Sequence, residues 1–307
     1  MEGILPLFKP AGMTSHDCVF KLRKILKTKK VGHTGTLDPD VTGVLPICIG
    51  RATKVAEYIT DAGKAYEGEV TLGFSTETED ASGLEVSRLP INRVISRREV
   101  LDVLSTLTGE IEQTPPMYSA VKVNGKRLYE YARKGIEVER PSRMVTIYSL
   151  ELLDERDEFA GETITFKFRA VCSKGTYIRT LAVMIGEKLG YPAHMSSLVR
   201  IRSASYSLED CLTFSEIEEL MAKGEIERAL KPIASALLNL PKYRINDTLA
   251  EKVKNGVRLR IPEEFSNHSG PIVLEGMSGQ VFAIYQKHPE KDGLMKPVKV
   301  LWTGSGE

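Results

Sequence analysis

The residue that most strongly suggests chemistry is Asp38, inside the segment Gly32-His-Thr-Gly-Thr-Leu-Asp-Pro39. Two glycines lie before it, and prolines at positions 39 and 46 follow it, so the backbone around this aspartate is constrained on both sides. A carboxylate that projects from a rigid loop can act as a nucleophile or accept a proton. An aspartate before a proline also organises ordinary turns, so the loop by itself leaves both interpretations open.

Basic side chains are gathered in two segments, although the net charge of the chain is only +1. Residues 21–30 carry six basic side chains and no acidic one, and residues 122–143 carry seven basic against three acidic ones. Such separation can steer a polyanion to one face of a protein that is nearly neutral overall. Runs of lysine and arginine are also common on solvated helix faces, which is the alternative interpretation.

The composition is that of an ordinary globular protein, with 42% hydrophobic and 27% charged residues. The sequence contains no run of about 18 apolar residues, so no transmembrane helix is expected. The first ten residues lack the pattern of a secretory signal. We therefore expect a cytoplasmic protein without membrane contact. The four cysteines form no CxxC pair, so neither a zinc site nor a disulfide framework is expected.

The elements that must position Asp38 alternate between strand and helix, which predicts a mixed α and β protein. Residues 4–8 are expected to form a strand, and a helix capped by Thr14 or Ser15 should follow. We expect residues 31–50 to be mainly loop because they are rich in glycine, threonine and proline. Further strands are expected at 65–73, 145–153 and 163–171. Further helices are expected at 96–107, after a capping box at Ser96 and Glu99, at 176–189, and after a second capping box at Thr213 and Glu216.

Two other segments have a distinct character. Residues 114–143 combine turn signals, aromatic residues and charge, which predicts a partly exposed, mobile excursion from the core. A domain boundary is expected near Asn239-Leu-Pro241, so that residues 1–239 and 240–307 form two domains. The second domain should contain one short helix at 247–255 and strands at 271–275, 280–285 and 297–301.

Four ordered blocks of the sequence resemble the bacterial tRNA pseudouridine-55 synthases, the TruB family. The segment GHTGTLDPDVTGVLPICIGRATK from Gly32 resembles the family's catalytic motif, and Leu7–Ser15 resembles its N-terminal motif. Lys64-Ala-Tyr66, with Leu72-Gly and Thr78-Glu-Asp80, resembles a second block. Val171–Leu181 resembles a third, with Ser197-Leu-Val-Arg200 just beyond it. The agreement spans about residues 3–240.

This resemblance implies an α+β fold and a set of site residues. The expected fold is a pseudouridine synthase catalytic domain, with a mixed, mainly antiparallel central sheet flanked by helices, and a small β-rich PUA-like C-terminal domain. The implied catalytic residues are Asp38, Tyr66 and Arg179. The implied substrate-binding residues are His33, Lys9, Pro10, Leu198, Asp80, Gly35 and Thr36. The expected RNA clamp in the insertion 114–143 comprises Tyr118, Lys122, Lys126, Arg127 and Arg143.

The reaction that the resemblance implies breaks the N1–C1′ bond of a uridine, rotates the uracil, and forms a C5–C1′ bond. It involves no redox change, so no cofactor and no metal are expected. Asp38 could attack C1′ as a nucleophile, or it could remove a proton at C2′ to give a glycal, and the sequence does not choose between these. Either role requires an ionised Asp38, which a neighbouring arginine favours.

The expected partner is tRNA, bound at the T-arm with its target base flipped out, with further contact at the acceptor end through the PUA-like domain. We expect a stand-alone monomer that needs neither a guide RNA nor a protein partner. Two alternatives remain open at this stage. The chain could be an RNA-binding or RNA-folding protein without chemistry, or a glycoside hydrolase that uses Asp38 with a second carboxylate.

Overall fold

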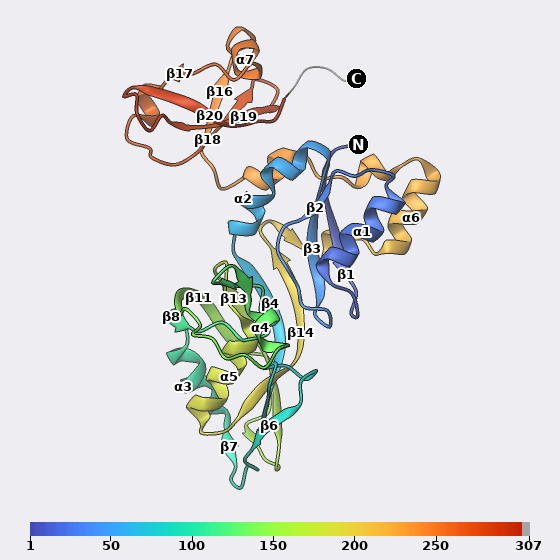
Figure 1. Cartoon of the computed structure of the whole chain (residues 1–307), viewed down its shortest axis with the longest axis vertical. Coiled ribbons are helices and arrows are strands. Elements are labelled where there is room, and N and C mark those ends of the chain that lie inside the picture. The colour runs from blue at the N-terminus through green and yellow to red at the C-terminus, as the bar shows by residue number, and fades with distance from the viewer. Residues whose placement is uncertain (303–307) are drawn as a thin grey trace.

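A nine-stranded mixed sheet forms the centre of the structure, which is a computed structural model that describes residues 1–302 (Figure 1). Its neighbouring strands are antiparallel, except that β3 and β14 run parallel. The strands of the main path are, in spatial order, β1 (Gly3–Lys9), β3 (Thr42–Ile49), β14 (Ala193–Ser203), β4 (Lys64–Leu72), β13 (Ile164–Cys172), β11 (Arg143–Leu152) and β8 (Gly109–Gln113). Two short strands extend it, β2 (Val31–His33) beside β3 and β15 (Tyr206–Ser207) beside β14.

Two groups of helices pack against different parts of this sheet. Helices α3 (Arg97–Thr106) and α5 (Ile178–Leu189) share one apolar core with β4, β11, β13 and β14. Helices α1 (Ser15–Ile25) and α6 (Phe214–Lys223) share a second core with β1 and β3. A short helix, α2 (Ala56–Asp61), follows the 3₁₀ turn Gly50–Val55. The expected α+β fold with a mainly antiparallel sheet is confirmed.

Helix starts follow the capping signals of the sequence. Ser96 and Glu99 form the capping box of α3, and Thr213 and Glu216 form that of α6, as predicted. Thr14 caps α1 and forms a third box with Asp17. Each box satisfies backbone N–H groups that the first turn of a helix leaves without partners.

The expectation that residues 31–50 are mainly loop is wrong. Val31–His33 and Thr42–Ile49 are strands, and the loop covers only residues 34–41. Glycine and proline are unfavourable in strand interiors, which is why the sequence suggested a loop. Here Pro46 lies opposite Pro6 of β1, and Gly43 lets β14 approach so closely that a Cβ atom at position 43 would lie 2.2 Å from the Arg200 carbonyl oxygen.

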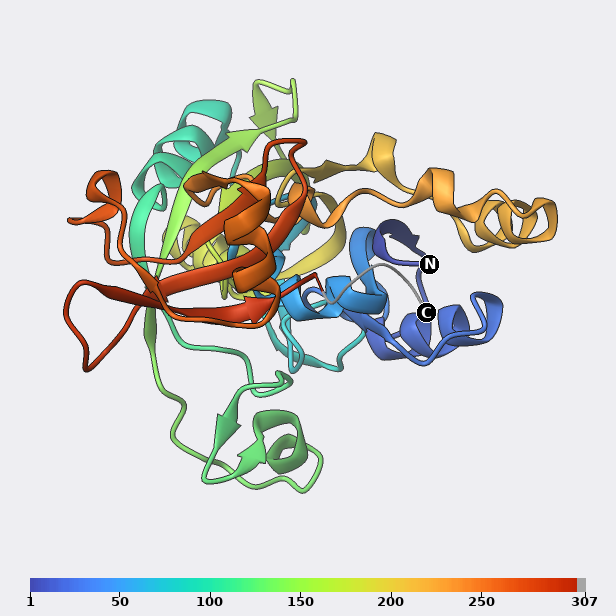
Figure 2. The same ribbon diagram turned by 90° about the horizontal axis from the view of Figure 1, so that it is seen from above.

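The insertion 114–143 extends away from the sheet (Figure 2). It contains the hairpin β9 (Lys122–Val123) and β10 (Lys126–Arg127), followed by the short helix α4 (Leu128–Ala132). Leu128 is fully buried, whereas Lys126 and Arg127 are exposed. The other peripheral strands are β5 (Phe74–Thr76), β6 (Glu85–Arg88), β7 (Ile95–Ser96) and β12 (Glu158–Phe159).

Residues 242–300 build a separate five-stranded sheet with a core of its own (Figure 1). Helix α7 (Asp247–Lys254) packs on it. The strands, in spatial order, are β16 (Lys242–Ile245), β18 (Ile272–Gly276), β19 (Val281–Lys287), β20 (Leu294–Val300) and β17 (Leu259–Arg260). The predicted helix at 247–255 and the three predicted strands are therefore present, displaced by a few residues.

Among residues 1–302, no helix is long and apolar enough to cross a membrane. The same residues contain no group of three or more His, Cys, Asp and Glu side chains that could hold a metal ion. All four cysteines are unpaired, and three of them are buried.

Candidate active site

The loop 34–41 is held from below by the ammonium group of Lys9. Lys9 is fully buried at the end of β1, and its Nζ donates hydrogen bonds to the carbonyl oxygens of Pro10, Pro39 and Val41, each at 2.8 Å. A buried ammonium group needs such acceptors, because leaving water without them is costly. Lys9 therefore fixes the backbone on the C-terminal side of Asp38. It lies beneath the loop and does not line the pocket described below.

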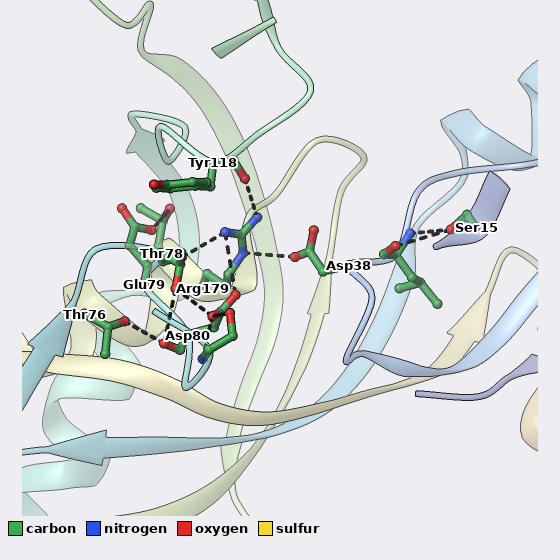
Figure 3. Close-up of polar contacts among 11 residues, drawn as sticks. Ser15, Asp38, Thr76, Thr78, Glu79, Asp80, Tyr118 and Arg179 are labelled. Atoms are coloured by element: carbon green, nitrogen blue, oxygen red, sulfur yellow. Dashed lines mark hydrogen bonds and ion pairs between the residues drawn. The ribbon is translucent and has the colours of Figure 1, made fainter. Parts of the chain in front are cut away.

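The N-terminal side of the same loop is anchored by helix α1. The backbone N–H of Leu37 donates to Ser15 Oγ at 2.8 Å, and the Ser15 hydroxyl faces the Leu37 carbonyl oxygen at 3.4 Å (Figure 3). Leu37 and Val41 are buried in the main core. Asp38 is thus the projecting residue of a loop that is fixed on both sides.

Arg179 forms an ion pair with the carboxylate of Asp38. Its Nε lies 2.9 Å from Asp38 Oδ2, and its Nη1 lies 3.8 Å from Asp80 Oδ2 (Figure 3). The same guanidinium donates to the carbonyl oxygens of Thr78 at 2.8 Å and Tyr118 at 2.9 Å. Arg179 is only 5% exposed, whereas the Asp38 side chain is 40% exposed. The arginine is therefore a buried group that contacts several acceptors, and Asp38 is the partner that stays accessible.

Helix α5 supplies Arg179 from its first turn. Tyr177 caps this helix, and the Gln113 side chain, at the end of β8, accepts from the Tyr177 N–H at 3.0 Å and donates to its carbonyl oxygen at 3.2 Å. At the other end, Gly190 adopts φ +86° and forms a left-handed cap. The position of Arg179 therefore follows from a helix that is fixed at both ends.

Burial and charge act in opposite directions on Asp38. Burial raises the pKa of the Asp38 carboxyl above its usual range, Arg179 opposes this, and the neighbouring Asp80 raises it further. The expectation that an arginine partner favours the ionised form holds for the contribution of Arg179 but not for the balance, which burial decides. A raised pKa suits a carboxylate that takes part in proton transfer or covalent chemistry.

A pocket of about 1200 Å³ opens beside Asp38. Its floor is one face of the central sheet, with Tyr66 on β4 and Leu198 on β14. Tyr66 is 7% exposed, and burial raises the pKa of its phenol, so that the ring stays neutral at ordinary pH. A pocket with an aromatic and aliphatic floor and a carboxylate at its side is suited to hold a planar ring next to a reactive group.

Three other predicted residues line the same pocket: His33, Gly35 and Thr36. The Gly35 N–H donates to His33 Nδ1 at 3.4 Å, and burial lowers the pKa of His33, so its imidazole is neutral. Asp80 lies behind Arg179 and, like Pro10, is not part of the pocket lining.

The predicted clamp residues divide into two groups. Tyr118, Arg127 and Arg143 line the pocket, so the insertion forms part of its wall. Lys122 and Lys126 belong to the exposed hairpin and do not line it. The Tyr118 carbonyl oxygen also binds Arg179, which links the insertion directly to the partner of Asp38.

Sequence reasoning missed several basic residues of the pocket, among them Lys64 and Arg200, which are buried. Both occur in the quoted motifs, two residues away from Tyr66 and Leu198 respectively. Alternate residues of a strand face the same side, so this spacing was the available signal. It was overlooked because lysine and arginine in strands are usually exposed.

Family models match most of the chain up to residue 238. The model described as "TruB family pseudouridylate synthase (N terminal domain)" matches residues 23–178. The model described as "tRNA pseudouridylate synthase B C-terminal domain" matches residues 179–238.

Named relatives and solved structures extend the agreement to nearly the whole chain. The tRNA pseudouridine synthase B of Geobacillus thermodenitrificans is 60% identical over 300 residues, which are 98% of this chain and 99% of the relative. That of Bacillus cytotoxicus is 58% identical over 98% of this chain and 97% of the relative. A chain in the crystal structure of a Cbf5-Nop10-Gar1 complex is 28% identical, covers 98% of this chain and 85% of its own length, and superposes with a TM-score of 0.74. The chain therefore belongs to the TruB family of tRNA pseudouridine synthases.

Proposed function

We propose that this enzyme isomerises a uridine in the T-loop of tRNA, at position 55, to pseudouridine, and that Asp38 is its catalytic carboxylate. The observation that carries the proposal is the pairing of an accessible Asp38 with a buried Arg179 beside the Tyr66 floor of a large pocket. The names of relatives that are 60% and 58% identical support the substrate class.

The geometry supports a separate role for each of the three proposed catalytic residues. Tyr66 stacks on the uracil and keeps it in the pocket while it rotates. Asp38 reacts at the ribose, either by attack on C1′ or by removal of the C2′ proton. Arg179 orients the Asp38 carboxylate and favours its ionised form.

The proposal includes flipping of the target base, because a side chain cannot reach the glycosidic bond of a stacked nucleotide. The neutral His33 and the loop residues Gly35 and Thr36 line the pocket where the flipped nucleotide would lie. Tyr118, Arg127 and Arg143 contribute the wall from the insertion, and Lys122 and Lys126 extend the basic surface of the hairpin outward. Lys9 and Pro10 act through the loop, because the Lys9 ammonium group joins the Pro10 carbonyl oxygen to the loop carbonyl oxygens of Pro39 and Val41.

We further propose two domains, with catalysis in residues 1–239 and additional tRNA contact in residues 240–307. The separate five-stranded sheet with its own core supports this division. The enzyme is proposed to be a cytoplasmic monomer that needs no guide RNA and no protein partner. The name of the relatives, tRNA pseudouridine synthase B, specifies a tRNA substrate, whereas the Cbf5 chain with 28% identity was solved together with Nop10 and Gar1.

The test uses purified protein and an unmodified tRNA transcript, with no other RNA or protein. Pseudouridine is mapped by chemical derivatisation and mass spectrometry. The expected result is one pseudouridine in the T-loop and none in a transcript whose T-loop target is replaced by cytidine. Pseudouridine at another position would refute the proposed site, and a requirement for a second RNA would refute the stand-alone form.

A further inference from the structure

Two basic side chains share the pocket floor with Tyr66. Lys64 and Tyr66 are two residues apart on β4, so they face the same side of the sheet. Arg200 lies directly opposite Tyr66 on the neighbouring strand β14, which puts its side chain on that face as well. All three residues line the pocket. A surface that holds a planar ring on Tyr66 therefore continues into two cationic groups.

Both cations are buried, and neither has a carboxylate partner among residues 1–302. Arg200 is 1% exposed, and its Nε donates to the Val44 carbonyl oxygen at 2.7 Å, but its Nη2 is buried without a hydrogen-bond acceptor. Lys64 is 8% exposed, and its Nζ donates to the carbonyl oxygens of Thr60 and Ala62, which leaves its third N–H free. Asp61, the acidic group that acts on Lys64, is itself paired with Lys174 at 3.0 Å.

Two buried and unpaired cations are costly, because buried charges normally have counter-charges. Burial, reinforced by Arg200, lowers the pKa of Lys64 to about 8, so this side chain is still mainly protonated at neutral pH. The missing counter-charge is thus expected to come from a ligand. Gly35 lies next to both groups, since a Cβ atom at this position would be in van der Waals contact, at 3.8 Å, with Arg200 Nη1 and Lys64 Cε.

The isomerisation generates such a counter-charge. When the N1–C1′ bond breaks, its electron pair stays with the base. The uracil is then a monoanion, with its charge shared between N1 and the carbonyl oxygens. In one route C1′ bonds to an Asp38 oxygen, and this bond breaks again when C5 attacks C1′. In the other route Asp38 removes the C2′ proton, which leaves a C1′–C2′ double bond, and the proton returns to C2′ when C5 attacks C1′. The charge disappears when C5 bonds to C1′, and the proton lost from C5 balances the one gained at N1. A group that stabilises this transient charge lowers the barrier to cleavage.

We propose that Lys64 and Arg200 stabilise the negative charge on the detached uracil, by donating hydrogen bonds to its carbonyl oxygens while the base rests on Tyr66. This inference rests on the function proposed above. An RNA phosphate is the other source of an anionic oxygen. The deep position of both side chains, on the same buried face as Tyr66, favours the base, because a phosphate would have to give up most of its hydration to reach it.

The test compares variants in single-turnover reactions at saturating tRNA. Two transcripts are used, one with uridine and one with 5-fluorouridine, whose fluorine stabilises the uracil anion. Disappearance of the target nucleoside is followed, and the dissociation constant is measured in parallel. On the uridine transcript, Arg200→Met and Lys64→Met should each lower the rate about 100-fold, with little change in affinity. Arg200→Lys should recover part of the loss, because it restores the charge.

The fluorinated substrate separates charge stabilisation from a structural role. A leaving group that carries its charge more easily needs less help, so the deficit of both Met variants should shrink about 10-fold or more on the 5-fluorouridine transcript. Arg202→Met, two residues along β14 at an exposed position, is the matched control and should leave both rates unchanged. If Arg200→Met does not fold, as thermal unfolding will show, Lys64→Met and Arg200→Lys carry the test.

Two results would overturn the inference. Equal deficits on both transcripts would assign the pair a structural role. Weaker binding with a smaller salt dependence and an unchanged rate at saturation would assign it to a phosphate. Both results require an active wild type, so they differ from failure of the proposed function, which would appear as an inactive wild type or an active Asp38→Asn variant.

Discussion

Burial and nearby charges act in opposite directions on the pKa of Asp38. Burial and the Asp80 carboxylate raise its pKa, whereas Arg179, at 2.9 Å, lowers it. Because the side chain is 40% exposed in the open pocket, a bound nucleotide would remove more water from it. Arg179 is then the neighbouring group that most strongly favours the ionised carboxylate against burial.

The pH dependence of the single-turnover rate follows from this balance. Asp38 must be ionised, so the rate should fall as the pH drops through its raised pKa, at a higher pH than for an ordinary aspartate. Asp80→Asn removes a charge that raises this pKa and should move the acid limb to lower pH. The matched control is Asp40→Asn, an exposed neighbour in the same loop, which should leave the limb in place. An acid limb that moves upward in Asp80→Asn would mean that Asp80 acts mainly by orienting Arg179.

Helices and strands were predicted well from the sequence where they depend on residues close together in the chain. The capping boxes at Ser96 and Thr213 were found because each is formed by residues three apart. The strand Thr42–Ile49 was missed because its pairing with β1 and β14 is long-range and overrides the poor strand preference of Gly43 and Pro46. Burial of Lys9 could not be predicted either, because its three acceptors come from two loops that only the fold brings together.

Lys9 is expected to contribute more to stability than any surface lysine. Lys9→Met would keep most of the volume but remove the ammonium hydrogen bonds to three carbonyl oxygens, of which that of Pro39 keeps a second donor, the Gly12 N–H. The free energy of unfolding should fall by about 3–5 kcal/mol. Urea denaturation of Lys9→Met and of the exposed Lys29→Met measures the difference. Equal stability of the two variants would show that the Lys9 ammonium does not hold the loop.

The insertion should act through its charge on tRNA binding. Arg127 is exposed and lines the pocket, so Arg127→Gln should weaken tRNA binding and reduce the slope of log Kd against log salt by about 1. Lys188→Gln on α5 removes one exposed charge away from the pocket and serves as the control. Filter binding at several salt concentrations gives both slopes. Identical slopes for the two variants would remove Arg127 from the RNA interface.

The C-terminal sheet packs against the rest of the molecule. Val55 and Leu237 form an apolar cluster with Val273, Ile284 and Leu301. Two polar contacts accompany it, from Lys54 Nζ to the Val300 carbonyl oxygen at 2.8 Å and from Lys299 to Glu57 at 3.3 Å. The boundary expected near Asn239-Leu-Pro241 stays a prediction, and the sequence did not predict this interface, because its residues are scattered over the chain.

The exposed Arg258, which precedes β17, and the exposed Arg260 in β17 are suited to test whether the C-terminal sheet contacts tRNA. The double variant Arg258→Gln and Arg260→Gln should weaken tRNA binding but leave the single-turnover rate at saturating tRNA unchanged, because both residues lie outside the pocket. The exchange affects exposed side chains and should leave the thermal unfolding midpoint unaltered. Unchanged affinity would count against a role of these arginines in binding.

The catalytic role of Asp38 is tested by pseudouridine formation on one unmodified tRNA transcript, with the wild type, Asp38→Asn and Asp40→Asn compared. We expect pseudouridine with the wild type and with Asp40→Asn, and none with Asp38→Asn, which should still bind the transcript. Pseudouridine formed by Asp38→Asn, or none formed by a wild type that binds tRNA tightly, would contradict this role.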